Sequence, residues 1–218
     1  FVGAVAPGYR ADLLVLNDLN TVDIEDVYSR GEKVVQRKQM KAFDCPEIAE
    51  ELCKTVRNSF HTKELTVADF HIAEKGNNCR VIKIIPGQLL TREQVCQIDW
   101  SKNNGIDTAR DILKLAVIER HKNTGHIGLG FIRGIGLKKG AIASSVSHDS
   151  HNIIVIGSND EDMVIAANHI RKNGGNVVVS AGKIIADMAL PIAGLMTELS
   201  GEEIALVNEK VRKAVYEL

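Results

Sequence analysis

The feature that most constrains this chain is a nine-residue polar segment, residues 144–152, placed between two stretches that a folded protein would bury. It reads Ser-Ser-Val-Ser-His-Asp-Ser-His-Asn and contains four serines, two histidines, an aspartate and an asparagine. A glycine-rich stretch, 125–140, precedes it, and the apolar run 153–156 follows it. Because a buried polar group needs a hydrogen-bonding partner, a hydrophobic core has no use for this composition. The segment is therefore predicted to lie at a functional site.

Composition excludes several classes of function. The 218 residues can form one large or two small domains, and 44% hydrophobic with 25% charged residues is typical of a soluble globular protein. The net charge of −1 gives no reason to expect a nucleic-acid or acidic-membrane partner. Aromatic residues make up only 4%, which argues against platforms for stacking bases. The apolar runs are too short to span a bilayer, and no signal peptide is recognisable.

The four cysteines, Cys45, Cys53, Cys79 and Cys96, show no Cys-x-x-Cys spacing. A chain of this size with scattered cysteines is predicted to keep them as reduced thiols in a cytoplasmic protein. A disulfide framework or a zinc knuckle is not indicated.

Strand and helix patterns alternate without strict βαβ repetition, which predicts an α+β fold. Short β-sandwich-type strands are expected at the N-terminus, in a domain 1–42, and a mixed α/β domain is expected over 43–218. The expected strands are residues 11–16, 32–36, 69–72, 80–85, 153–157, 176–180 and 183–188. The expected helices are residues 47–60, with Asp44 as a candidate cap, then 107–121, 158–172 and 201–216.

The glycines in 128–136 have the spacing Gly-x-Gly-x-x-x-Gly, which differs from the dinucleotide-binding fingerprint Gly-x-Gly-x-x-Gly. No predicted strand precedes them as that motif requires. They are interpreted instead as positions where the backbone passes close to a neighbour or a ligand.

The sequence His148-Asp149-Ser150-His151 admits two interpretations. On a helix the two histidines would share a face and could help to bind zinc, manganese or iron with further ligands from elsewhere. In the other interpretation Asp149 and Ser150 bond to the local backbone and one histidine caps a strand. His121 and His126 flank a turn near the end of the predicted helix 107–121, where they are expected to satisfy its last carbonyl groups.

Residues 126–152 closely resemble the C-terminal domain of bacterial and archaeal-type adenine deaminases, and the resemblance continues through 153–157, 159–163 and 190–196. Residues 3–17 are similar to the strand pair that follows the catalytic barrel in the amidohydrolase superfamily. The resemblance implies hydrolysis of adenine to hypoxanthine and ammonia. It also implies a binuclear manganese or iron centre in a (β/α)8 barrel, where a metal-bound hydroxide attacks the purine.

The metal ligands of that barrel include a His-x-His pair, and none of the seven histidines here forms one. The chain also begins with Phe1. It is therefore expected to be a C-terminal piece that lacks the barrel, is inactive alone, and holds no certain catalytic residue. Because the segment is so dense in polar side chains, we hypothesise that His148, Asp149, Ser150, His151 and Asn152 complete the purine pocket or support the metal centre, with His148 and His151 as candidate metal contacts.

Two other readings remain open at this point. In the first reading, the chain is an assembly domain that joins copies of a homo-oligomer, and the polar segment is a subunit contact. In the other it is a self-contained metal hydrolase that uses His148, Asp149 and His151 with His121 or His126.

Overall fold

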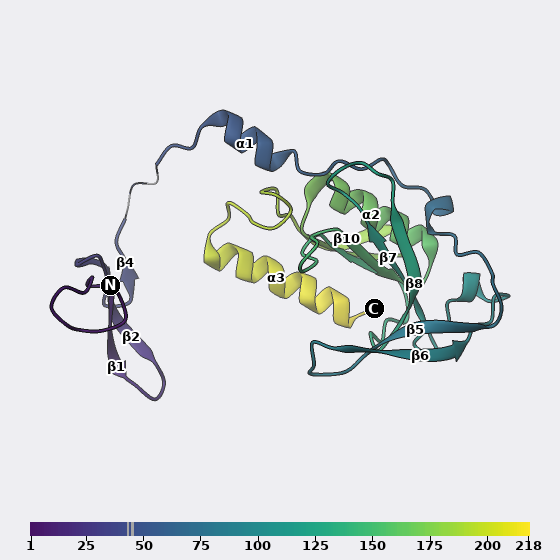
Figure 1. The fold of residues 1–218 in the computed structure, drawn as a ribbon, viewed down its shortest axis with the longest axis horizontal. Helices are drawn as coiled ribbons and strands as arrows, with labels where there is room; N and C mark the ends of the chain where they lie inside the picture. The colour runs from purple at the N-terminus through teal and green to yellow at the C-terminus, as the bar shows by residue number, and fades with distance from the viewer. Residues whose placement is uncertain (43, 45) are drawn as a thin grey trace. The chain divides into compact units, whose positions relative to one another are not determined.

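The computed structural model describes residues 1–42, 44 and 46–218, and the chain forms two units, Phe1–Ile48 and Ala49–Leu218. The first unit is a small antiparallel sheet, and the second combines a larger mixed sheet with helices (Figure 1). The predicted α+β class is therefore confirmed. The prediction of a reduced thiol at Cys45 lies outside the described residues.

Four strands build the first unit and pair antiparallel in chain order. They are β1 (Leu13–Asp18), β2 (Asp23–Ser29), β3 (Glu32–Gln36) and β4 (Gln39–Met40). The range of β3 matches the prediction for 32–36, whereas β1 begins later than the predicted 11–16. Asp12 fixes the turn between β2 and β3, because its Oδ1 accepts a hydrogen bond from Arg30 N at 2.7 Å.

The second unit is built on an eight-stranded sheet in the order β12-β11-β9-β10-β7-β8-β5-β6. Its strands are β5 (Asn78–Ile84), β6 (Thr91–Gln97), β7 (Leu113–Ile118), β8 (Ile127–Arg133), β9 (Ala141–Ser144), β10 (Ile153–Gly157), β11 (Asn176–Ser180) and β12 (Lys183–Met188). Neighbours in the sheet are antiparallel except β5 and β8, which are parallel.

Three helices, α1 (Glu50–Arg57), α2 (Asp160–Asn173) and α3 (Gly201–Tyr216), and two 3-10 segments, η1 (Val67–Phe70) and η2 (Asn103–Gly105), complete the second unit. Helix α2 packs on one face of the sheet, where Met163 and Ile170 meet Val155. Helix α3 packs on the opposite face, where Val211 meets Ile156 (Figure 1). Val155 and Ile156 are neighbours in β10, but they face α2 and α3 respectively, because successive side chains of a strand point to opposite faces. Strand β10 therefore lies at the centre of the core.

The prediction of a helix over 107–121 is wrong, because Leu113–Ile118 is strand β7, paired with both β8 and β10. Its side chains alternate in direction: Leu113 contributes to the core on the α3 face, and Ala116 and Ile118 to the core on the α2 face. A strand buried on both faces shows a continuous apolar run, which periodicity does not distinguish from a buried helix.

Three further expectations need correction. Residues 69–72 are not a strand, because Val67–Phe70 is the 3-10 segment η1, closed by hydrogen bonds from Thr66 to the Asp69 carboxylate. The helix predicted over 47–60 is shorter, and Ala49 rather than Asp44 stands at its N-cap. Strands β6, β8 and β9 were not predicted, and β8 occupies part of the glycine-rich stretch.

The C-terminal elements follow the predictions closely. The strands β10, β11 and β12 and the helix α3 have the expected bounds, and α2 ends one residue beyond the expected 172. Asn159 caps α2 by accepting a hydrogen bond from Asp162 N at 2.7 Å. Ser200 and Glu203 form a reciprocal capping box at the start of α3. Within the described residues, no helix has the length and apolar character needed to cross a bilayer.

Helix α2 is joined to the sheet by a buried ion pair. Lys114 of β7 is fully buried, and its Nζ donates to Asp160 Oδ1 at 2.5 Å and to Phe70 O at 2.9 Å. Asn104 Nδ2 donates to the other carboxylate oxygen of Asp160 at 3.1 Å. Because both charges are paired and hydrogen-bonded, the pair fixes the start of α2 against β7.

The substitution Lys114→Met should destabilise the second unit by about 3–5 kcal/mol, because it leaves the buried Asp160 carboxylate without its cation. The measurement is urea unfolding followed by the fluorescence of Trp100, the only tryptophan of the chain. The control is Lys83→Met on the exposed part of β5, which should change stability by less than about 0.5 kcal/mol. An unchanged urea midpoint for Lys114→Met would show that the pair does not hold the helix.

Candidate functional site

The polar segment of the sequence forms a loop between the central strands β9 and β10, and residues 145–152 are called the polar loop below. Its base is buried and anchored. Ser145 is fully buried, and its Oγ accepts from Gly175 N at 2.7 Å and lies 2.6 Å from Gly194 O, to which it donates. Ser147 is also buried, and its carbonyl oxygen accepts from His151 N at 2.5 Å. The loop therefore starts from a fixed position.

The segment 190–196 closes against this base, and Gly194 makes the approach possible. A Cβ atom at Gly194 would lie 2.7 Å from the Phe60 ring and 3.1 Å from Ser145 Oγ. Real Cβ atoms do not come so close to a packed ring, so a larger residue would push the segment away from the loop.

The tip of the polar loop faces solvent. The side chains of His148 and Asp149 are 87% and 85% exposed, and His148 Nδ1 contacts Asp149 Oδ1. The rings of His148 and His151 lie edge to face with centroids 6.2 Å apart. His151 Nδ1 and Asn152 Oδ1 are buried and have no hydrogen-bond partner among the described residues. The loop thus combines two exposed polar side chains with two polar atoms that are ready to bind.

A buried arginine holds the end of the loop. Arg120 is 2% exposed and lies at the end of β7, with its guanidinium 4.2 Å from the centroid of the Phe60 ring. Its Nε donates to His151 O at 2.5 Å, its Nη1 to Ser59 O at 3.1 Å and its Nη2 to Ala193 O at 2.9 Å. Burial lowers the pKa of Arg120 from its usual value, and the guanidinium remains charged at neutral pH. One side chain therefore ties three separate segments together.

The turn between β7 and β8 carries His121 toward the loop. Glu119 closes this turn, because its carboxylate accepts hydrogen bonds from the backbone N–H groups of His121, Lys122 and Thr124 and from the Thr124 hydroxyl. The Thr124 N–H contributes most, and the set lowers the pKa of Glu119 from 4.5 to about 2 against an opposing effect of burial. The carboxylate thus stays ionised well into acid.

His121 and His126 do not satisfy the end of a helix, because the element directly before them is strand β7. That expectation is wrong for the same reason as the helix 107–121. His121 Nε2 lies 2.9 Å from Ser150 O and donates to it in the tautomer that carries the proton on Nε2. His126 lies across the turn, where its carbonyl oxygen accepts from Glu119 N at 3.0 Å. His121 is therefore a support of the polar loop.

The residues that the structure describes do not form a metal site by themselves. Within the described ranges, no three His, Cys, Asp or Glu side chains are grouped so that they could hold a metal ion. His148 contacts Asp149, and its ring centroid lies 6.2 Å from that of His151, but a structural or catalytic metal needs further ligands. The arrangement therefore fits hydrogen bonding to a polar ligand better than binding of a metal by this chain.

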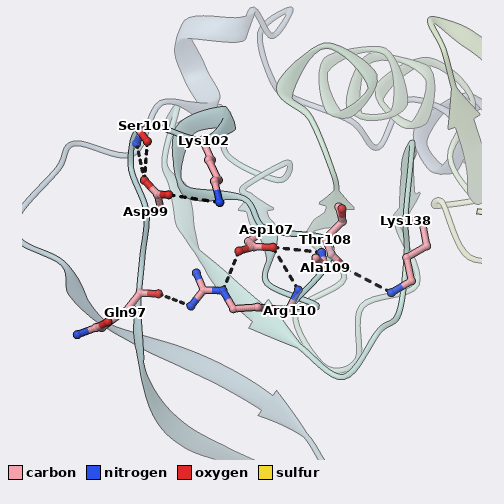
Figure 2. A network of polar contacts seen from close by, with 9 residues as sticks. All are labelled: Gln97, Asp99, Ser101, Lys102, Asp107, Thr108, Ala109, Arg110 and Lys138. Carbon is pink, nitrogen blue, oxygen red and sulfur yellow. Dashed lines mark hydrogen bonds and ion pairs between the residues drawn. The ribbon is translucent and has the colours of Figure 1, made fainter.

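A second group of polar side chains lies next to a depression of about 870 Å³ at the ends of β6 and η2. Arg110 Nε donates to Asp107 Oδ2 at 2.7 Å, and its Nη1 donates to Gln97 O at 2.9 Å (Figure 2). Lys138 Nζ donates to Thr108 O at 3.3 Å. The hydrogen bond from Arg110 lowers the pKa of Asp107. Because these groups are paired with one another, we infer that they stabilise the 97–110 region.

Comparison with known proteins decides the family. The model of the adenine deaminase C-terminal domain matches residues 88–218, which is more than half of the chain. The chain belongs to the adenine deaminase C-terminal domain family. Residues 88–218 include the polar loop, Arg120 and the segment 190–196. The predicted resemblance is thereby confirmed.

Relatives described as adenine deaminase match almost the whole chain. The protein from Dehalococcoides mccartyi is 40% identical over 215 residues, 97% of this chain and 37% of that protein. The one from Oleidesulfovibrio alaskensis is 41% identical over 225 residues, 99% of this chain and 37% of its own length. The one from Brucella abortus is 42% identical over 219 residues, 99% of this chain and 36% of its own length. The chain thus spans little more than a third of the relatives it matches.

The polar loop of this adenine deaminase C-terminal domain was predicted from the sequence, but three features that hold it were not: Glu119, Arg120 and the anchoring role of Ser145. A signal for two of them was present, because Glu119 and Arg120 follow a six-residue strand directly. A charged pair at that point marks the end of a buried strand, and the prediction of a helix across it concealed this meaning.

The substitution Arg120→Lys should loosen the polar loop even though it keeps the charge. An ammonium group cannot reproduce the planar fork that reaches three carbonyl groups, so at least one of them loses its partner. We expect a loss of about 2–4 kcal/mol in urea unfolding, and faster amide hydrogen exchange in the 145–152 region. The matched control is Arg110→Lys, which should leave exchange in the polar loop unchanged. Equal protection of the loop in Arg120→Lys and the unsubstituted protein would contradict this account.

The substitution Glu119→Gln should destabilise the protein in a pH-dependent way. The pKa of Glu119 is lowered on folding, so its contribution is complete above its ordinary value of 4.5 and declines as the pH falls toward about 2. The difference in stability between the two proteins should therefore be constant at neutral pH and shrink below about pH 4.5. Denaturant unfolding at a series of pH values measures this difference. A difference that grew on acidification would contradict the assignment.

Proposed function

We propose that this chain is the C-terminal part of an enzyme that hydrolyses adenine to hypoxanthine and ammonia, and that the polar loop completes its active site. The observation that carries the proposal is the contrast within the loop. Ser145, Ser147 and Arg120 are buried and fix its base, whereas His148 and Asp149 are exposed at its tip. An exposed polar tip on a rigid base suits contact with a ligand or surface outside the unit.

The side chains of the loop suit a purine. An imidazole and an amide can each donate and accept hydrogen bonds, and a carboxylate accepts them, so together they can match ring nitrogens and an exocyclic amino group. His148 and Asp149 reach solvent. His151 Nδ1 can accept or donate according to its tautomer, and Asn152 Oδ1 can accept, once a ligand or neighbouring segment is near. Ser150 adds a hydroxyl, whose Oγ accepts a hydrogen bond from Asn152 N at 3.3 Å. All five predicted site residues thus lie on one loop, and their roles toward adenine stay a proposal.

The metal centre belongs, in this proposal, to the part of the relatives that this chain does not cover. We expect a binuclear manganese or iron centre in an upstream (β/α)8 barrel, because the described residues of this chain offer no grouped ligands. The prediction that His148 and His151 contact the metal stays a prediction. Residues 1–42 would supply strands of the small β-sandwich next to that barrel, and residues 43–218 the extra domain. The free thiols at Cys53, Cys79 and Cys96 agree with the cytoplasmic location that we propose.

A second candidate function is assembly of a homo-oligomer. It is favoured by one observation, the exposed apolar side chains at the turn and outer face of the β5–β6 hairpin. Leu89 and Leu90 are 104% and 73% exposed, and Val95 is 61% exposed. Exposed apolar residues that lie together are typical of contact surfaces. In this second candidate function, the polar loop would be a further subunit contact, as in the assembly reading of the sequence, and would matter for association and not for turnover.

The experiment is adenine turnover by a complete enzyme that carries the double substitution His148→Ala/His151→Ala. We expect kcat/KM for adenine to fall at least about 10–100-fold, because two groups that bind the purine or position it are lost. The control is His126→Ala, which removes an exposed imidazole without touching the loop and should keep normal kinetics.

The metal content and the oligomeric state of the same variants separate the two functions. The proposal requires both to stay normal while turnover falls. Full turnover by the double variant would exclude the active-site role, and dissociation of the oligomer with normal turnover would favour the assembly role.

A further inference from the structure

Two cysteines face each other across the hairpin at the edge of the large sheet. Strand β6 is the last strand of that sheet in the described part of the chain, and β5 is its only partner there. Cys79 of β5 lies directly opposite Cys96 of β6 in the antiparallel register. Both are free thiols, and both are partly buried against the cluster that contains Val81, Ile98 and Phe131. The two side chains therefore point to the same inner face.

The backbone spacing at this position matches that of a disulfide. Ile98 N donates to Asn77 O at 2.7 Å, which makes 77 and 98 a hydrogen-bonded pair of the ladder. Such pairs recur every two residues, so Cys79 and Cys96 form the next one, with Cα atoms about 5.5 Å apart. Disulfides usually join Cα atoms separated by about 4.4–6.8 Å.

The Cβ atoms set a further condition. Opposite Cβ atoms in a ladder lie about 4.5–5.5 Å apart, with hydrogen-bonded pairs such as this one toward the upper value, and a disulfide needs about 3.5–4.5 Å. Closing the bond therefore requires the two strands to approach by about 1 Å. An edge hairpin can make this movement more easily than a central pair, because β6 pairs on one side only within the described residues.

We propose that Cys79 and Cys96 form a reversible cross-strand disulfide when the protein meets a disulfide oxidant such as oxidised glutathione. The site does not depend on the proposed catalytic function. Its effect is local: the bond links the two strands at the open end of the β5–β6 hairpin, opposite the turn that carries Leu89 and Leu90.

The chemistry is thiol–disulfide exchange and balances without another reactant. One protein thiol loses its proton, and the thiolate attacks a sulfur of oxidised glutathione, which releases one glutathione thiolate. The second protein thiolate then attacks the protein sulfur of this mixed disulfide and releases the other glutathione. Two protein S–H bonds are lost and one S–S bond forms, while one oxidised glutathione becomes two reduced molecules.

Trp100 provides a local reporter for this reaction. Its Nε1 donates to Gly76 O at 2.9 Å, and Cys79 Sγ lies 3.8 Å from the same oxygen. Trp100 is also the only tryptophan in the chain. Because disulfides quench nearby indole fluorescence, formation of the bond should lower the emission of the protein.

The test uses the full chain with the background substitutions Cys45→Ser and Cys53→Ser, so that Cys79 and Cys96 are the only thiols. The folded protein is incubated with oxidised glutathione, and its intact mass and its protease-derived peptides are measured without reduction. We expect a loss of two hydrogen atoms, a peptide pair linked through Cys79 and Cys96, lower Trp100 fluorescence, and recovery of all three after dithiothreitol.

The single substitution Cys96→Ser in the same background is the matched control. It should accept one glutathione at Cys79 at most, and form no internal link. Burial raises the pKa of the Cys79 thiol, so the reaction should also be faster at higher pH. Persistent glutathione adducts on the two-cysteine protein, or thiols that remain unreacted under conditions that oxidise the unfolded chain, would overturn the proposal.

Discussion

The candidate site depends on one buried guanidinium. Arg120 binds the carbonyl oxygens of His151, Ser59 and Ala193, which lie 31, 61 and 73 residues from it in the sequence. A buried charge is costly unless its hydrogen-bonding groups are satisfied, so the three segments and the arginine stabilise one another. The same carbonyl groups would be left unpaired without it. The end of the polar loop is therefore fixed by Arg120, in addition to the anchoring of its start by the loop's own Ser145.

Within the polar loop, the residues that are buried and anchor it differ from those that are exposed at its tip. The buried Ser145 and Ser147 hold the strand ends, and His121 supports the backbone at Ser150 from the next turn. The exposed His148 and Asp149 contribute little to the core of the unit. Their polar side chains are thus exposed to solvent at the tip of the loop.

The sequence was sufficient for features that depend on local signals. The strands 153–157, 176–180 and 183–188 and the helix 201–216 were predicted with the bounds that the structure has. The polar loop was found because its composition is incompatible with a core. The strand β7 was missed because it is buried on both faces, so its residues show no alternation between apolar and polar types. Arg120 and Lys114 were missed because their partners come from distant segments, which a pattern along the chain does not reveal.

The most direct test of the central claim is complementation between this chain and the catalytic part of a related adenine deaminase. Hypoxanthine formation from adenine, with manganese present, is measured for each part alone and for the two together. The account predicts that turnover appears only in the mixture, and that it falls when this chain carries Arg120→Lys. Full turnover by the catalytic part alone would contradict the claim that the polar loop completes the site, and so would turnover by this chain alone.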